Sequence, residues 1–103
     1  MTRLEMERRA AEWMGVDLTK LWNIPPAYGS DLNLWPPIYA KLDALSRLDE
    51  YAGQEPDRLF CEALEAIACE RLKLVGYNAG LAYIGATAED RLRALIAVIG
   101  EGK

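Results

Sequence analysis

The stretch Ala86-Thr87-Ala88-Glu89-Asp90-Arg91 decides how one end of this chain folds. Thr87 is placed to cap a helix with its hydroxyl, and Asp90, three residues on, can return a bond to the Thr87 N–H in a capping box. An apolar stripe then recurs at i, i+3, i+4 and i+7: Leu92, Leu95, Ile96 and Ile99. Gly100 follows the stripe. The pattern predicts an amphipathic helix that ends at Ile99 and closes the core, with Arg91 and Arg93 on or near its exposed side.

Two more helices are predicted from their ends. Thr2 and Glu5 have capping-box spacing at the start of a helix that runs to Met14, and Gly15 suits its C-terminus. Apolar residues recur at helical spacing from Pro56 to about Leu72, and proline suits the first helical position.

A fourth helix is predicted to begin at Pro36 or Pro37. Its buried stripe consists of Ile38, Leu42 and Leu45, with Leu48 as a further candidate. Its solvent-facing residues are Lys41, Asp43 and Arg47. Residues 17–37 form a long connection interrupted by Pro-Pro and Gly-Ser pairs, with a helical turn as an option at 17–22.

The stretch 74–84 is the one β-like segment, and Asn78-Ala79-Gly80 suits a hairpin loop. An irregular link over 73–85 is the alternative. We therefore predict a helix-rich α+β fold of about four helices and one small β-hairpin, in one globular domain spanning residues 1–103. An all-α bundle is the second choice.

The composition restricts the function classes. The chain has 103 residues, is 51% hydrophobic and carries a formal net charge of −4. This acidic balance makes nucleic-acid binding unlikely, because phosphate contacts require a basic surface. No apolar run approaches the roughly 20 residues that a membrane span requires. No signal peptide is recognisable, and we expect a cytoplasmic protein.

The two cysteines, Cys61 and Cys69, lie in one predicted helix. Eight residues of helix separate them by about 12 Å, too far for a disulfide. We expect both to be small buried hydrophobes.

Catalysis is not predicted, and neither is a cofactor or metal site. The chain contains no histidine, so a histidine-based triad or metal site has no ligand or base. Ser30 and Ser46, the two serines, are not in a nucleophile-elbow context. A helix-turn-helix reader is disfavoured because the 56–72 helix carries several acids on its exposed side.

Protein binding is the remaining class. Aromatic residues gather between positions 22 and 39, and interface cores favour Trp and Tyr. The candidate contact residues are Trp22, Tyr28, Trp35 and Tyr39, together with Asp49 and Glu50 of an acidic patch. For any single aromatic the simpler interpretation is favoured, namely that it pins the long connection onto the helices as part of the core.

Three segments together resemble small phage and prophage proteins of the phage ABA-sandwich family: Trp13-Met14-Gly15-Val16, Tyr28-Gly29-Ser30-Asp31 leading into Pro37-Ile38-Tyr39-Ala40-Lys41-Leu42, and Ala86-Thr87-Ala88-Glu89-Asp90-Arg91-Leu92-Arg93-Ala94-Leu95. The resemblance implies a phage or prophage origin and carries no activity with it. We therefore expect a non-catalytic phage or prophage accessory protein that binds a host or phage protein. An inhibitor of a host defence system, anti-CRISPR-like, is the most concrete form of this hypothesis. A minor virion structural or assembly protein, and a small enzyme or regulator working as a homo-oligomer, stay open as alternatives.

Overall fold

A computed structural model of the chain describes residues 1–73 and 79–100, without the side chains of 79–81. Within these ranges the chain is helical and contains no strand. The elements are α1 (Arg3–Met14), η1 (Leu18–Leu21), η2 (Leu32–Leu34), α2 (Pro36–Ser46), η3 (Asp49–Tyr51), α3 (Pro56–Leu72), α4 (Ala79–Gly85) and α5 (Ala88–Ile99), where η denotes a 3₁₀ helix. No helix of these ranges is long and apolar enough to cross a membrane.

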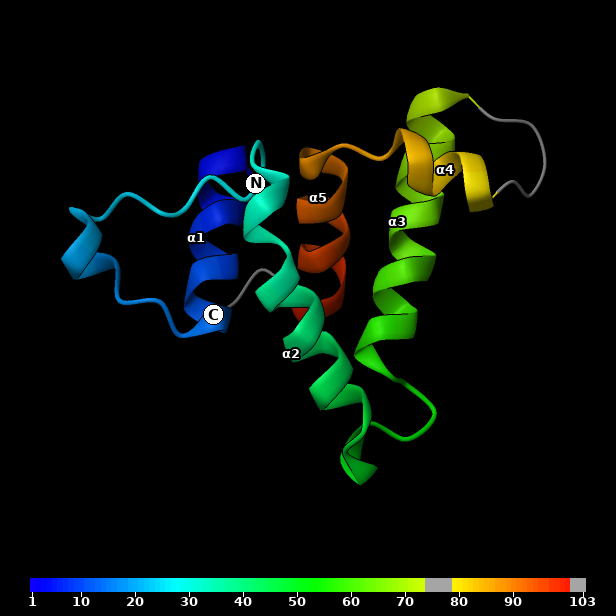
Figure 1. The fold of residues 1–103 in the computed structure, drawn as a ribbon, viewed down its shortest axis with the longest axis horizontal. Coiled ribbons are helices and arrows are strands. Elements are labelled where there is room, and N and C mark those ends of the chain that lie inside the picture. Colours follow the sequence, from blue (N-terminus) through cyan, green and yellow to red (C-terminus); the bar gives the residue numbers. More distant parts are fainter. Residues whose placement is uncertain (74–78, 101–103) are drawn as a thin grey trace.

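Helix α5 lies between α1 and α3 and packs against both (Figure 1). Helix α2 packs against α3, and the two diverge from the turn that joins them (Figure 1). Leu92 and Leu95 of α5 are completely buried, as the apolar stripe predicts. The long connection 15–35 extends to one side of the helices, beyond α1 (Figure 1).

The capping box of α5 is confirmed and has an additional partner. The Asp90 N–H donates to Thr87 Oγ1 over 3.1 Å, and the Thr87 N–H donates to Asp90 Oδ2 over 3.0 Å. Asp90 is only 2% exposed, and Arg71 Nε of α3 donates to its Oδ2 over 2.8 Å. One carboxylate thus starts α5 and also ties it to α3.

The other end of α5 is held by α1. Arg9 donates from Nε to the Gly100 carbonyl over 3.1 Å and from Nη2 to the Ile99 carbonyl over 3.2 Å. These are carbonyls that a helix C-terminus leaves without intrahelical donors. Helix α1 itself has the predicted ends, with Thr2 as N-cap and Gly15 in the left-handed region at φ 77°.

The predicted β-hairpin is wrong over its described part, because 79–85 form α4. The remaining hairpin residues, 74–78, lie outside the described residues. Both a two-stranded hairpin and a seven-residue helix are marginal in water by themselves, so packing against the rest of the fold decides between them. The side chain of Ala82 is completely buried, because α4 packs against α3.

Two predictions about α2 are also corrected. Leu48 is 46% exposed, because α2 ends at Ser46 and the chain has turned before this residue. Lys41 is not simply solvated: its Nζ lies 4.4 Å from the centre of the Trp13 ring and donates to the Trp13 carbonyl. The lysine therefore joins α2 to α1.

The prediction of two buried cysteines is wrong for Cys61, which is exposed, while Cys69 is partly buried. Position 61 faces an open pocket beside α3, so no side chain covers it. Both thiols are free, as the helical spacing predicts.

Candidate functional site

Two of the candidate aromatics belong to the core. Trp35 is completely buried and Tyr28 is 5% exposed. Trp35 Nε1 donates to the Tyr28 carbonyl over 2.9 Å, and its ring stacks on Phe60 of α3 with centroids 5.9 Å apart. Burial also raises the pKa of Tyr28 above its ordinary value. These contacts fix the end of the long connection on the helices.

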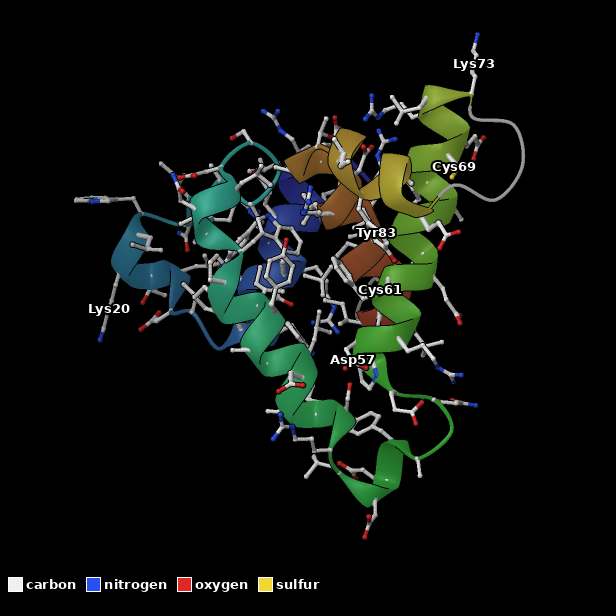
Figure 2. All side chains as sticks on the ribbon, turned by 45° about the vertical axis from the view of Figure 1, so that its right-hand side comes forward. Lys20, Asp57, Cys61, Cys69, Lys73 and Tyr83 are labelled. Carbon is white, nitrogen blue, oxygen red and sulfur yellow. The ribbon has the colours of Figure 1, made fainter. Side chains whose placement is uncertain are left out.

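Trp22 has the opposite environment. Its side chain is 90% exposed, and its backbone lies in the left-handed region at φ 56°, followed by Asn23 at φ 60°. Nearby Leu21 and Ile24 are 40% and 66% exposed. Lys20 belongs to the same turn and points away from the helices (Figure 2). We call residues 20–24 the loop tip.

The loop tip is anchored at its base. Asp17 Oδ1 accepts from the Thr19 N–H over 3.0 Å and from the Thr19 hydroxyl over 2.6 Å. The Asn23 N–H donates to the Leu18 carbonyl over 2.8 Å, and Arg8 Nη2 of α1 donates to the Asn23 carbonyl over 3.4 Å. Leu18 packs against the core. The exposed Trp22 thus stands on a hydrogen-bonded turn.

The remaining candidates lie elsewhere. Asp49 and Glu50 are exposed in η3, at the turn between α2 and α3, away from the connection that carries Trp22 (Figure 1). Tyr39 is 40% exposed on α2, with its ring 5.8 Å from that of Trp35. The structure does not bring the six candidates together into one surface.

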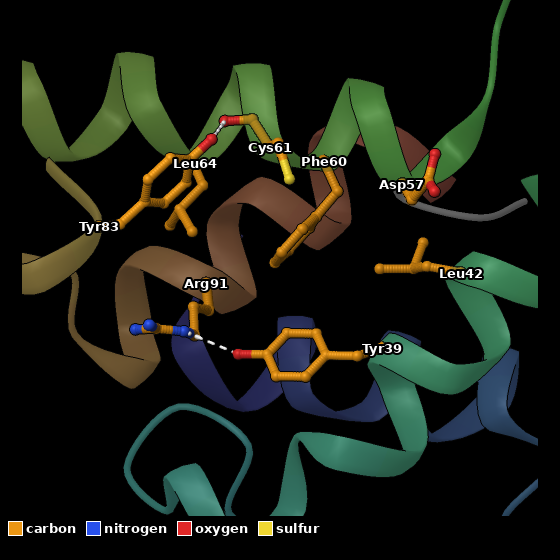
Figure 3. A pocket seen from close by; sticks show the side chains of 8 residues that line it. All are labelled: Tyr39, Leu42, Asp57, Phe60, Cys61, Leu64, Tyr83 and Arg91. Atoms are coloured by element: carbon orange, nitrogen blue, oxygen red, sulfur yellow. Dashed lines mark hydrogen bonds between the residues drawn. The ribbon is translucent and has the colours of Figure 1, made fainter. Parts of the chain in front are cut away.

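A second candidate site is a pocket of about 290 Å³ between α2, α3, α4 and α5 (Figure 3). Its lining residues are Tyr39, Leu42, Asp57, Phe60, Cys61, Leu64, Tyr83 and Arg91. Asp57 and Cys61 of α3 and Tyr83 of α4 follow one another along the same side of α3 (Figure 2). The pocket is open to solvent on the side of the exposed Cys61 and the half-exposed Tyr39.

Polar groups are placed at the rim of this pocket. Arg91 Nε donates to the Tyr39 hydroxyl over 2.8 Å, and Arg91 Nη1 donates to the Ala86 carbonyl over 2.6 Å. On the α3 side the Tyr83 hydroxyl donates to the Cys61 carbonyl over 3.3 Å. The pocket thus offers hydrogen-bond donors beside an apolar floor, an arrangement that suits the binding of a small ligand.

Sequence reasoning did not anticipate this pocket. The cap and the apolar stripe of α5 predict no contact for Arg91, yet this residue joins α5 to α2 through Tyr39. The two residues are far apart in the chain, and no local pattern signals their contact. An arginine in the first turn of an otherwise well-explained helix was the only available hint.

Comparison with protein-family models, with curated proteins and with solved structures finds no match to this chain.

Proposed function

We propose that the chain is a non-catalytic accessory protein of a phage or prophage that acts by binding another protein, most concretely as an inhibitor of a host defence system in the host cytoplasm. The phage or prophage assignment rests on the sequence resemblance. The binding assignment rests on the loop tip.

The observation that carries the binding proposal is the state of Trp22. A non-glycine residue in the left-handed region costs of the order of 1 kcal/mol, and such strain gathers at functional sites. With 90% of its side chain exposed, Trp22 gives the fold little burial in return. A strained, exposed tryptophan is therefore better explained by a contact with a partner than by stability.

The surroundings of Trp22 support the same interpretation. Large aromatic side chains dominate the binding energy of interfaces, because they bury much area with few rotatable bonds. Leu21 and Ile24 add exposed apolar surface beside it, and Lys20 adds a cation at the edge. The hydrogen bonds of Asp17 and Arg8 hold the turn before binding, which lowers the ordering entropy that association must overcome.

The test compares matched variants in affinity capture from lysate of phage-infected host cells, followed by quantitative mass spectrometry. Trp22→Ala removes the proposed anchor. Ile84→Ala is the control, because Ile84 is 83% exposed on α4, outside the loop tip. A partner of the native chain should bind Trp22→Ala about 30-fold more weakly and Ile84→Ala equally well, with both variants as stable as the native chain.

The identity of the captured protein decides between the hypotheses. A defence component recovered at a fixed ratio supports the inhibitor. Recovery of the chain in purified virions instead favours a structural or assembly role, and self-association alone favours a homo-oligomer. Equal capture by Trp22→Ala and the native chain would overturn the assignment of the loop tip.

A further inference from the structure

The pocket between α2, α3, α4 and α5 is large enough for one aromatic ring and has an apolar floor. Its volume of about 290 Å³ is at the lower end of the range for small-molecule sites. Leu42, Phe60 and Leu64 form its apolar lining and are themselves 2–4% exposed, so they are fixed by the core. Tyr39 and Phe60 place aromatic rings in its walls, with centroids 6.1 Å apart (Figure 3).

One end of the pocket is positive. The guanidinium of Arg91 bonds only to neutral acceptors, and no carboxylate among residues 1–73 and 79–100 forms a salt bridge with it. The Tyr39 hydroxyl accepts the Arg91 Nε–H, so it keeps its own proton to donate. A cation and a free donor thus meet at one edge of the apolar floor, which is the pairing that an anionic oxygen requires.

The opposite end of the pocket is negative. Asp57 lies at the far side of the Phe60 ring from Arg91 (Figure 3). Its Oδ1 already accepts from the Arg58 N–H over 2.6 Å. This carboxylate repels an anion and thereby sets the orientation of a bound molecule, with its negative group toward Arg91.

We propose that this pocket binds a small aromatic carboxylate, with the ring against Phe60, Leu42 and Leu64 and the carboxylate at Tyr39 and Arg91. The carboxylate belongs either to a free molecule or to the C-terminal residue of a peptide that ends in an aromatic side chain. The site is separate from the loop tip, so the two proposals fail independently.

Titration of the ¹⁵N-labelled protein by NMR tests the proposal with three probes of one shape: phenylacetate, phenylacetamide and benzylammonium. Phenylacetate should bind with a Kd of about 1 mM, given its few non-hydrogen atoms. Its shifts should centre on the amides of Leu42, Phe60 and Leu64. Phenylacetamide should bind at least about fivefold more weakly, because it lacks the charge, and any binding of benzylammonium should place its cation at Asp57 and be unaffected by Tyr39→Phe. An acetylated dipeptide ending in Phe, compared with its C-terminal amide, separates the peptide source from the free acid.

Variants place the binding in this pocket. Tyr39→Phe keeps the ring and removes the donor, so phenylacetate should bind about fivefold more weakly. Cys61→Phe fills the pocket from an exposed position and should abolish binding, which keeps the test available if Tyr39→Phe disturbs the fold. Tyr51→Phe removes a hydroxyl outside the pocket and should change nothing. Equal binding of phenylacetate and phenylacetamide, or phenylacetate binding that survives Cys61→Phe, would overturn the proposal.

Discussion

Replacing Asp90 with alanine removes three interactions of one buried carboxylate. The return bond from the Thr87 N–H contributes about 1 kcal/mol. A negative charge in the first turn of α5 contributes about 0.5 kcal/mol through the helix dipole. The pair with Arg71 contributes about 1 kcal/mol, a low value because the Arg71 side chain is 41% exposed and screened by solvent. Asp90→Ala should therefore lower the unfolding free energy by about 2.5 kcal/mol.

Neighbouring variants divide this loss into its parts. Thr87→Ala removes only the other bond of the cap and should lower the unfolding free energy by about 1 kcal/mol. Asp90→Asn keeps an acceptor for the cap but loses the ion pair, so its loss should be intermediate. A double-mutant cycle of Asp90→Ala with Arg71→Met should give a coupling of about 1 kcal/mol.

Urea unfolding followed by circular dichroism at neutral pH gives these values, with Glu89→Ala as the control. Glu89 pairs with Arg93 across an exposed helix turn at 3.4 Å and should contribute less than about 1 kcal/mol. A loss for Asp90→Ala no larger than that for Thr87→Ala, or a coupling near zero, would refute the account of a carboxylate shared between the cap and α3.

Three further changes have defined outcomes. Burial raises the pKa of Tyr28 above 10.0, so the unfolded chain loses the phenolic proton at a lower pH than the folded chain does. The unfolding free energy should therefore fall as pH rises through about 10. Urea titrations between about pH 8 and pH 11 should show this fall for the native chain, and Tyr28→Phe should remove the part of it that is due to Tyr28. The added Cβ of Gly15→Ala meets no atom within 4 Å, but the alanine is forced to adopt a φ of 77°. The substitution should lower the unfolding free energy by about 1 kcal/mol and, with it, the melting temperature. An unchanged melting temperature would contradict the left-handed end of α1. Lys41→Met should lower the unfolding free energy by about 1 kcal/mol by removing the contacts with Trp13. Arg47→Met is the control: Arg47 follows the last residue of α2 and forms only an exposed pair with Asp43, so the loss should be less than about 0.5 kcal/mol.

Local signals predicted the helices that have clear ends. The Thr2 and Thr87 caps, Gly15 and the prolines that begin α2 and α3 act through backbone groups within one turn, so the sequence displays them directly. The segment 79–85 was predicted as part of a hairpin because its apolar run is short and Asn78-Ala79-Gly80 suits a hairpin loop, whereas packing against α3 accompanies the helix α4 that it forms.

The candidate site depended on tertiary contacts that no local pattern contains. The sequence indicated that aromatics of the 22–39 segment mattered, but Trp35 enters the core because it stacks on Phe60 of a later helix, while Trp22 finds no such partner and stays exposed. Arg91 and Tyr39 meet only once α5 and α2 are in place, so their pocket was beyond sequence reasoning.

The central position of α5 sets an order of events during synthesis of the protein. The ribosome makes α1, α2 and α3 before the helix that α1 and α3 both pack against, so their apolar faces stay uncovered until α5 leaves the exit tunnel. The bonds from Arg9 to the carbonyls of Ile99 and Gly100, about ninety positions later, cannot form before those two residues have been made. A nascent chain stalled before residue 88 therefore offers exposed apolar helix faces to chaperones, because the helix that covers them has not yet been made.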